Sequence, residues 1–425
     1  MKKALIWIVV FLGWIPAPAF AESTLTLPQA FELARKNNIA FQAVQREAES
    51  VEGDLIQAGL IPNPTLELEQ KSTPFPGFQE GERGLFLSQE LELGGKRSAR
   101  VSVAQKALEA AQFKVAEIAR QLRQKVRVSF YEAWVAQERM KVLEEISASQ
   151  KLFLDLSKAR VKLGDIPGVE VKLVSAEYLR IQQKLEGARK DVQTALADLA
   201  QLLALPLDEK PALQAPDKGP ADFPDLSGLL SQAFQNRPDL RAQEMNVQKA
   251  LAQVRLEKAL AIPNLTVGAG TVLDKLLIHG EDVSPPGAIS EINDSDRLYQ
   301  IRFSFPLPLF DRNQGNILKS ERLYESEILK EQDLRRAIQT EVMTAWQKVA
   351  ANLKIQERFQ KELLPVVKEN LHIIEKAYRL GGQSVLAVIQ AERTLFETQL
   401  DYLDNLRQLE GSIALLESAA GIELP

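Results

Sequence analysis

Few side chains in this sequence could form a catalytic or metal-binding site. Its two histidines, His279 and His372, are expected in a loop and in a helix, and cysteine is absent. Because a metal site needs several converging imidazole, thiolate or carboxylate ligands, both histidines are interpreted as surface residues. The sequence also lacks a glycine-rich phosphate loop and a paired nucleophile and base. We therefore expect a protein that is not an enzyme and that uses no cofactor or resident metal.

A second set of charged side chains occurs in short stretches that alternate with a period of two. Its members are Glu67, Glu69, Glu90 and Arg302. On the inner surface of a β-barrel, such carboxylates could attract cations by focusing the electric field. They could equally be the solvated face of any strand, so the pattern leaves both roles open.

Four candidate strands carry these residues, at about 65–69, 84–91, 265–269 and 299–305. Each places apolar side chains on one face and polar side chains on the other. Such strands could be flaps on a soluble protein or strands in a membrane. Since the smallest closed membrane barrels need about eight strands, the membrane interpretation requires several copies of the chain.

A single stretch from Lys96 to Leu163 has no proline and no internal glycine, so it is predicted to be one helix. An unbroken helix of that length would be on the order of 100 Å long. Its apolar residues follow heptad spacing at first and then steps of four, which indicates neighbours on two sides. The stripe comprises Ala104, Leu108, Ala111, Val115, Ile118, Leu122, Val126, Phe130 and Trp134.

The chain is internally repeated, because the segment 60–65 recurs at 261–266 and the segment 162–164 recurs at 379–381. Each repeat is predicted to contain helices, two strands, a very long helix, a tight turn and a returning helix. The first repeat spans 22–235, with strands at about 64–92, a long helix at about 96–163, a returning helix at about 170–205 and a connector at 206–225. The second spans 236–425, with strands at about 264–308, a long helix at about 316–380 and a returning helix at about 385–419.

Individual residues give further local expectations. Asn236 is expected to cap a helix that has Pro238 in its first turn. Pro365 is expected to kink the second long helix, and the pair Gly94–Gly95 to ease a bend from strand to helix.

The N-terminus predicts export from the cytoplasm. Two lysines precede an apolar run over 4–15, and Ala19 and Ala21 form a cleavage site, so residues 1–21 are interpreted as a signal peptide. The run is shorter than the roughly 20 residues of a spanning helix, and the lack of cysteine argues against an N-terminal lipid anchor. The net charge of −5 does not indicate binding to nucleic acid.

Several motifs resemble the TolC-like outer membrane efflux family over nearly the whole mature chain. They are Asn236–Leu240, Ile262–Asn264, Tyr378–Gly381, Ser384–Leu386 and Ala391–Glu392. The resemblance implies a mainly α fold with a small β part, a homotrimer with a twelve-stranded transmembrane barrel, and a helical tunnel. It also implies a bacterial outer membrane location with a long periplasmic extension, in contact with outer-membrane lipid, a periplasmic adaptor and an inner-membrane pump.

Two stretches, 91–97 and 308–315, are similar to the branch that serves cobalt-zinc-cadmium exporters of the resistance-nodulation-division class. The expected function is therefore the outer-membrane exit duct of a three-part efflux system for heavy-metal cations. Drug efflux, type I protein secretion and a periplasmic coiled-coil scaffold without a pore are the alternatives.

The resemblance also assigns roles at the two helical turns. Adaptor-docking candidates are Arg160, Leu163, Gly164, Arg379, Leu380 and Gly381. A purely structural helix end explains the two glycines equally well. Related channels carry aspartates beyond the second turn, whereas this chain has Ala387 and Gln390 there. Tyr378, Gln383 and Gln390 are therefore expected to narrow the periplasmic aperture.

Overall fold

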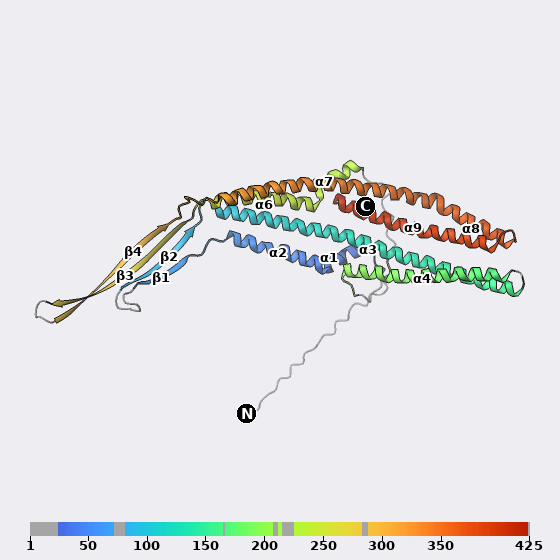
Figure 1. Ribbon diagram of the computed structural model, residues 1–425, viewed down its shortest axis with the longest axis horizontal. Coiled ribbons are helices and arrows are strands. Elements are labelled where there is room, and N and C mark those ends of the chain that lie inside the picture. The colour runs from blue at the N-terminus through green and yellow to red at the C-terminus, as the bar shows by residue number, and fades with distance from the viewer. Residues whose placement is uncertain are drawn as a thin grey trace, which may run out of the picture.

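The structure is a computed structural model that describes residues 24–71, 81–164, 166–206, 211–214, 225–282 and 288–423. The molecule is a long rod with the strands at one end and two helical turns at the other (Figure 1). Within the described ranges, every helix is too short or too polar to qualify as a membrane span. The expected signal peptide and the tips of both strand hairpins lie outside the described residues.

The first two helices of the first repeat begin at polar caps. Thr26 and Gln29 form a capping box at the first helix, and the Asn38 side chain accepts a hydrogen bond from the Phe41 amide at 2.9 Å. The next helices follow a strand-to-helix bend and a turn. The bounds are α1 (Leu27–Asn37), α2 (Ile39–Gly59), α3 (Lys96–Lys162) and α4 (Gly168–Leu203).

The second repeat has the same order of helices. Its elements are α5 (Leu226–Asn236), α6 (Pro238–Leu260), α7 (Gln314–Arg358), the π-turn η1 (Phe359–Leu363), α8 (Leu364–Arg379) and α9 (Val385–Ala420). The expected capping by Asn236 is wrong. Arg237 occupies the N-cap position of α6 without a side-chain cap, because Asn236 is still the last residue of α5.

The second long helix is interrupted where the sequence predicted only a kink at Pro365. The Leu364 amide donates to the Phe359 carbonyl five residues earlier, which is the π-helical pattern. Proline has no amide hydrogen, so the regular bond from residue 365 to residue 361 cannot form. The irregular turn absorbs that loss, and Pro365 falls in the first turn of α8.

Within the described residues, four antiparallel strands form one sheet in chain order. They are β1 (Thr65–Lys71), β2 (Gly81–Leu91), β3 (Leu265–Asp282) and β4 (Ala288–Ser304). The prediction of a mainly helical protein with a small four-stranded part is thus confirmed. His279 lies in β3 opposite Glu291 and not in the predicted loop, because β3 and β4 pair as far as Asp282 and Ala288.

Each repeat has its own apolar core near mid-length. In the first, Ala30 and Ala34 of α1 pack against α3 and α4, and in the second Leu229 and Ala233 of α5 pack against α7 and α9. Burial of such side chains stabilises a fold by roughly 25 cal/mol per Å² of apolar surface. In both repeats, a short helix therefore packs against the long helix and the returning helix.

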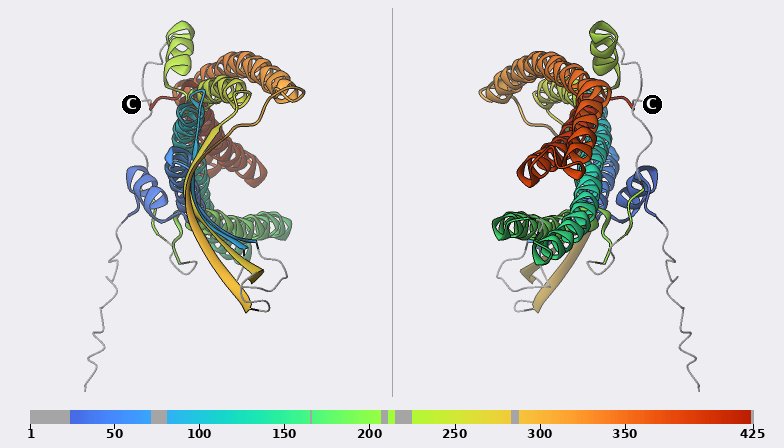
Figure 2. Two further views of the ribbon diagram at one scale, coloured as in Figure 1. Left: turned by 90° about the vertical axis from the view of Figure 1, so that its left-hand side faces the viewer. Right: turned by 90° about the vertical axis from the view of Figure 1, so that its right-hand side faces the viewer.

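The upper helices stack end to end on the returning helices. The Asn38 side chain donates to the Leu202 carbonyl at 3.0 Å where α2 meets α4. Arg237 donates to the Ala419 carbonyl at 3.2 Å where α6 meets α9. Seen along the long axis, the elements form an arc that is open on one side (Figure 2).

Candidate functional site

The strand register gathers the predicted ion-facing residues on one surface of the sheet, which we call the polar face. Glu67 pairs with Phe86, and Glu69 pairs with Gly84. Arg302 pairs with Gly268, which is itself opposite Ser88. Alternation therefore places Glu67, Glu69 and Arg302 on the face that also carries Phe86.

The opposite surface, which we call the apolar face, is rich in large exposed side chains. Ile301 and Phe303 are 71% and 68% exposed in the single chain. Others on this face are Leu66, Leu68, Leu85, Leu87 and Tyr299. A continuous apolar surface of this kind is unfavourable in water and marks contact with lipid or protein.

Glu90 lies on the polar face with the other glutamates, as expected, and pairs with Thr266. It also belongs to a joint between sheet and helices. The Asn264 side chain donates to Glu90 Oε1 at 2.6 Å, and the ammonium of Lys96 donates to Asn264 Oδ1. Lys96 is buried, so this chain of contacts fixes the start of α3 against the second repeat. Gly94 and Gly95 have φ of 72° and 73°, a left-handed backbone that glycine adopts without strain.

The C-terminal end of α2 is held at the same joint between sheet and helices. Arg97 Nε donates to the Gly59 carbonyl at 2.7 Å, and Arg100 Nε donates to the Ala58 carbonyl at 2.9 Å. Arg100 also pairs with Glu92 at 2.6 Å, which lowers the pKa of that carboxyl. The stretch 91–97, which suggested a metal-exporter branch, thus carries contacts that anchor the sheet to the helices.

The two helical turns at the far end of the rod expose equivalent residues. Leu163 and Leu380 are 77% and 79% exposed. Gly164 and Gly381 have φ of 80° and 79°, so a side chain at either position would strain the turn. Arg379, Gln383 and Gln390 are also exposed.

The structure brings together two residues to which the sequence assigned different roles. Arg160 Nη1 of α3 donates to the hydroxyl of Tyr378 in α8 at 2.8 Å, and its guanidinium lies 5.5 Å from the ring centroid. Phe153 meets the same ring edge-on at 6.1 Å. Arg160, an expected docking residue, and Tyr378, an expected aperture residue, therefore link the helix pair α3–α4 to the pair α8–α9.

A partly buried carboxyl group, missed in the sequence, lies farther from the turns on α9. Glu392 Oε2 accepts a hydrogen bond from the Gln150 side chain of α3. Burial raises the pKa of Glu392 to about 7, and the charges of Glu375 on α8 and Glu177 on α4 add to that rise. The Ala391–Glu392 motif and the matching pair Ala176–Glu177 mark this position in the sequence, but neither indicates that the carboxyl group is buried.

The raised pKa predicts a pH-dependent stability that Glu392→Gln removes. The folded state holds a proton that the unfolded state releases between about pH 4.5 and 7, so stability falls as pH rises through that window. The neutral amide avoids this loss, and Glu392→Gln should be more stable than wild type by about 2 kcal/mol at pH 8. Thermal unfolding of the purified protein at pH 5 and pH 8 measures the difference.

Glu397→Gln is the matched control, since Glu397 lies on the same helix in an exposed pair with Arg393 at 2.9 Å. It should leave the pH dependence unchanged. Equal pH dependence in wild type and Glu392→Gln would contradict the prediction.

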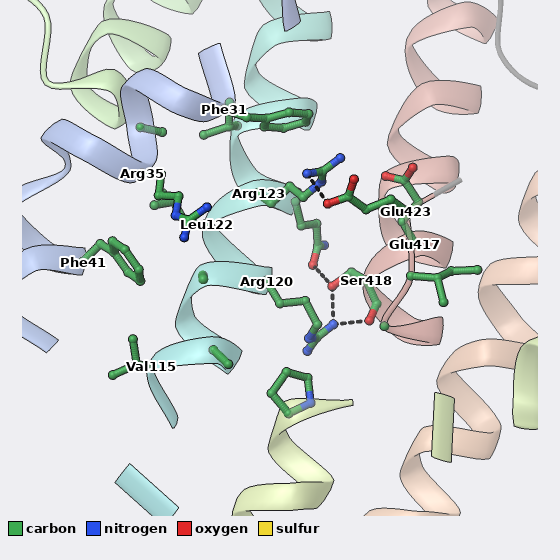
Figure 3. A pocket seen from close by; sticks show the side chains of 18 of the residues that line it. Phe31, Arg35, Phe41, Val115, Arg120, Leu122, Arg123, Glu417, Ser418 and Glu423 are labelled. Carbon is green, nitrogen blue, oxygen red and sulfur yellow. Dashed lines mark hydrogen bonds and ion pairs between the residues drawn. The ribbon is translucent and has the colours of Figure 1, made fainter. Parts of the chain in front are cut away.

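A cavity of about 560 Å³ lies at mid-length, where α1, α2, α3 and the end of α9 meet (Figure 3). Arg123 lies 4.3 Å from the centroid of the Phe31 ring and pairs with Glu423 at 2.5 Å. Arg120 donates to the carbonyl and hydroxyl of Ser418. The contacts with Glu423 and Ser418 cross from the first repeat to the second, so the cavity walls act as a joint between repeats.

The described residues offer no resident metal site, since no three histidine, cysteine or acidic side chains among them gather suitably. The structure presents a polar and an apolar sheet face at one end, and two exposed turns with an internal link at the other.

Comparisons with known proteins agree with this architecture. The chain matches the family described as outer membrane efflux protein over residues 30–205 and 229–422. It is similar to the cobalt-zinc-cadmium resistance protein CzcC of Cupriavidus metallidurans, with 27% identity over 418 residues, covering 95% of this chain and 92% of that protein.

A second relative exports a different cargo. The pyoverdine export outer membrane protein OpmQ of Pseudomonas putida is 25% identical over 367 residues, covering 83% of this chain and 72% of that protein. Among solved structures, CusC has a TM-score of 0.72 at 18% identity, covering 93% of this chain and 92% of that one. At that identity, the likeness shows a shared fold.

Proposed function

The chain belongs to the outer membrane efflux protein family, and from that membership we propose that it is the exit duct of a three-part efflux system for heavy-metal cations. Efflux through the outer membrane follows from membership of this family. The metal cargo, the trimer, and the partnership with an adaptor and a pump of the resistance-nodulation-division class are the steps that we propose beyond it.

The two faces of the sheet are the observation that carries the duct proposal. An apolar face with Ile301 and Phe303 exposed suits lipid, and a polar face with Glu67, Glu69 and Arg302 suits a water-filled bore. Four strands cannot close around a bore. Three copies supply twelve strands, and the helical arc of each chain then becomes one third of a continuous wall.

The metal cargo rests on the likeness to a cobalt-zinc-cadmium resistance protein over nearly the whole chain. A deletion strain tests it by growth on zinc, cobalt and cadmium and by the metal content of the cells. We expect lower tolerance and higher metal content, both restored by the wild-type gene. Unchanged metal tolerance, with lost export of a siderophore or a drug, would replace the metal cargo with the alternative that the pyoverdine exporter represents.

At the far end, we propose that the link between Arg160 and Tyr378 holds the periplasmic aperture closed. If α8 and α9 must move away from α3 and α4 to open it, the hydrogen bond at 2.8 Å has to break. A hydrogen bond to a charged group contributes about 1.5–3 kcal/mol, so Tyr378→Phe should raise the ratio of open to closed channels about tenfold or more. Single-channel recording of the purified protein measures this ratio.

Tyr402→Phe is the control, because Tyr402 on α9 accepts a hydrogen bond from Gln360 at 2.9 Å without joining α3. The open fraction of this variant should match that of wild type. An equal effect of both substitutions would remove the aperture role from Tyr378.

A further inference from the structure

One aromatic side chain lies on the polar face among charged and polar neighbours. Phe86 pairs with Glu67 of β1 and with Gly270 of β3. Only 2% of its surface is exposed, although the face around it is hydrophilic. A ring at the surface of a strand stays accessible unless other groups cover it, so its neighbours must bury it on both sides.

Two glycines make room for the Phe86 ring on the side that faces the sheet backbone. A Cβ atom added at Gly270 would lie 2.3 Å from a ring carbon of Phe86 and 2.3 Å from the Leu85 carbonyl oxygen. A Cβ atom added at Gly84 would lie 2.7 Å from another ring carbon. Real Cβ contacts are never this short, so the ring lies flat against strand backbone that only glycine leaves free.

Arg302 covers the other side of the ring. Its guanidinium carbon lies 3.5 Å from the Phe86 ring centroid, which is a close cation–π stack. The same guanidinium lies 3.9 Å from Glu69 Oε2 and donates to Gln300 Oε1 at 3.3 Å. Arg302 therefore reaches across the sheet from β4 towards β1 and is held by three groups.

We propose that Phe86 is a positioning residue that fixes the Arg302 guanidinium over the bore, and that this charge sets how strongly the channel prefers cations to anions. The proposal rests on the proposed function, because it takes the polar face to be the wall of the bore. In a trimer, three guanidinium groups would stand at one level beside three Glu69 carboxylates. Each fixed positive charge offsets a carboxylate and repels cations that pass close to it.

The Phe86 ring affects selectivity by restricting the motion of the Arg302 guanidinium. Arginine has a long flexible side chain, and a charge that moves through a large volume produces a weaker field at any one point. Stacking on Phe86 confines the planar guanidinium, and lysine cannot reproduce that stack. Arg302 is thus the residue that determines selectivity, and Phe86 acts through it.

The test is the reversal potential of the full-length protein in planar bilayers under a potassium chloride gradient. We expect Arg302→Gln to raise the permeability ratio of cation to anion about threefold or more. Phe86→Leu and Arg302→Lys should shift the ratio in the same direction by less. Because Phe86 acts through Arg302, adding Phe86→Leu to Arg302→Gln should change nothing further.

Phe303→Leu is the matched control, since Phe303 lies next to Arg302 in β4 but on the apolar face. Its ratio should equal that of wild type. The inference would be overturned if Arg302→Gln formed pores with unchanged selectivity, or if Phe86→Leu still altered the selectivity of Arg302→Gln. Either result would leave the proposed channel function standing. A protein that forms no pores would overturn the proposed function itself.

Discussion

Arg237→Ala should lower the free energy of unfolding by about 3–5 kcal/mol, because it removes one partner from a buried charge network. Arg237 is 3% exposed, and its guanidinium binds Asp239 at 2.6 and 3.0 Å and Glu341 at 2.6 Å. It also donates to the Ala419 carbonyl at 3.2 Å, which joins α6 to the end of α9. Alanine would remove both guanidinium bonds to the Asp239 carboxylate, which would keep only the Leu240 amide as a donor, and would also leave this carbonyl without its arginine donor.

Denaturant unfolding in detergent, followed by circular dichroism, measures the loss. Arg322→Ala is the matched control, since Arg322 is 67% exposed and pairs with Glu325 at 2.7 Å on the same helix. Exposed pairs of this kind contribute less than about 1 kcal/mol. If both arginine substitutions had the same small effect, Arg237 would not be the junction that the structure indicates.

The second large effect concerns the turns, where Leu163→Asp together with Leu380→Asp should abolish export while pores remain. Both leucines are more than three-quarters exposed in the chain, as expected for side chains that a partner covers. Replacing a central apolar contact in an interface by a charge is expected to weaken binding by 2 kcal/mol or more, or about 30-fold per position. The measurements are metal tolerance of a complemented deletion strain and pore formation by the purified variant.

Leu163→Met with Leu380→Met is the control, because methionine keeps the apolar surface and close to the same volume. This pair should restore tolerance to the level of wild type. Full tolerance with both aspartates present would contradict the proposed docking of an adaptor at these turns.

Residue patterns in the sequence were sufficient to anticipate the large elements. The absence of proline and glycine between Lys96 and Leu163 predicted one rod, and the structure has α3 over Lys96–Lys162. Period-two alternation predicted which strand residues share a face, and the pairing of Glu67 with Phe86 agrees with it. Patterns of this kind depend on local sequence alone.

Features that depend on contacts between distant residues could not be predicted in this way. The bonds from Gln150 to Glu392 and from Arg237 to Glu341 join positions more than a hundred residues apart. The π-turn was missed because a proline in the sequence indicates that one backbone hydrogen bond is lost, but it does not indicate how the backbone rearranges around that position. The lengths of β3 and β4 were underestimated because Arg297 and the pair Lys275–Ser295 place polar side chains on the apolar face and so end the apolar alternation.

The residues that bury the Phe86 ring were visible in the sequence, although their contact was not predicted. Alternation placed it on the polar face, and glycines occur on the same face at Gly84 and Gly270. An aromatic residue beside a glycine on its own strand and another on the adjacent strand indicates a ring that lies on bare backbone. The strand register was needed to see that these residues face one another.

A duct of this kind requires that copies of this chain together enclose a water-filled path through the outer membrane. Conductance of the purified, full-length protein in a planar lipid bilayer tests it most directly. We expect discrete current steps of uniform size as single assemblies insert from detergent. A protein that produces no steps at any concentration, and that stays monomeric in aqueous buffer without detergent, would contradict it.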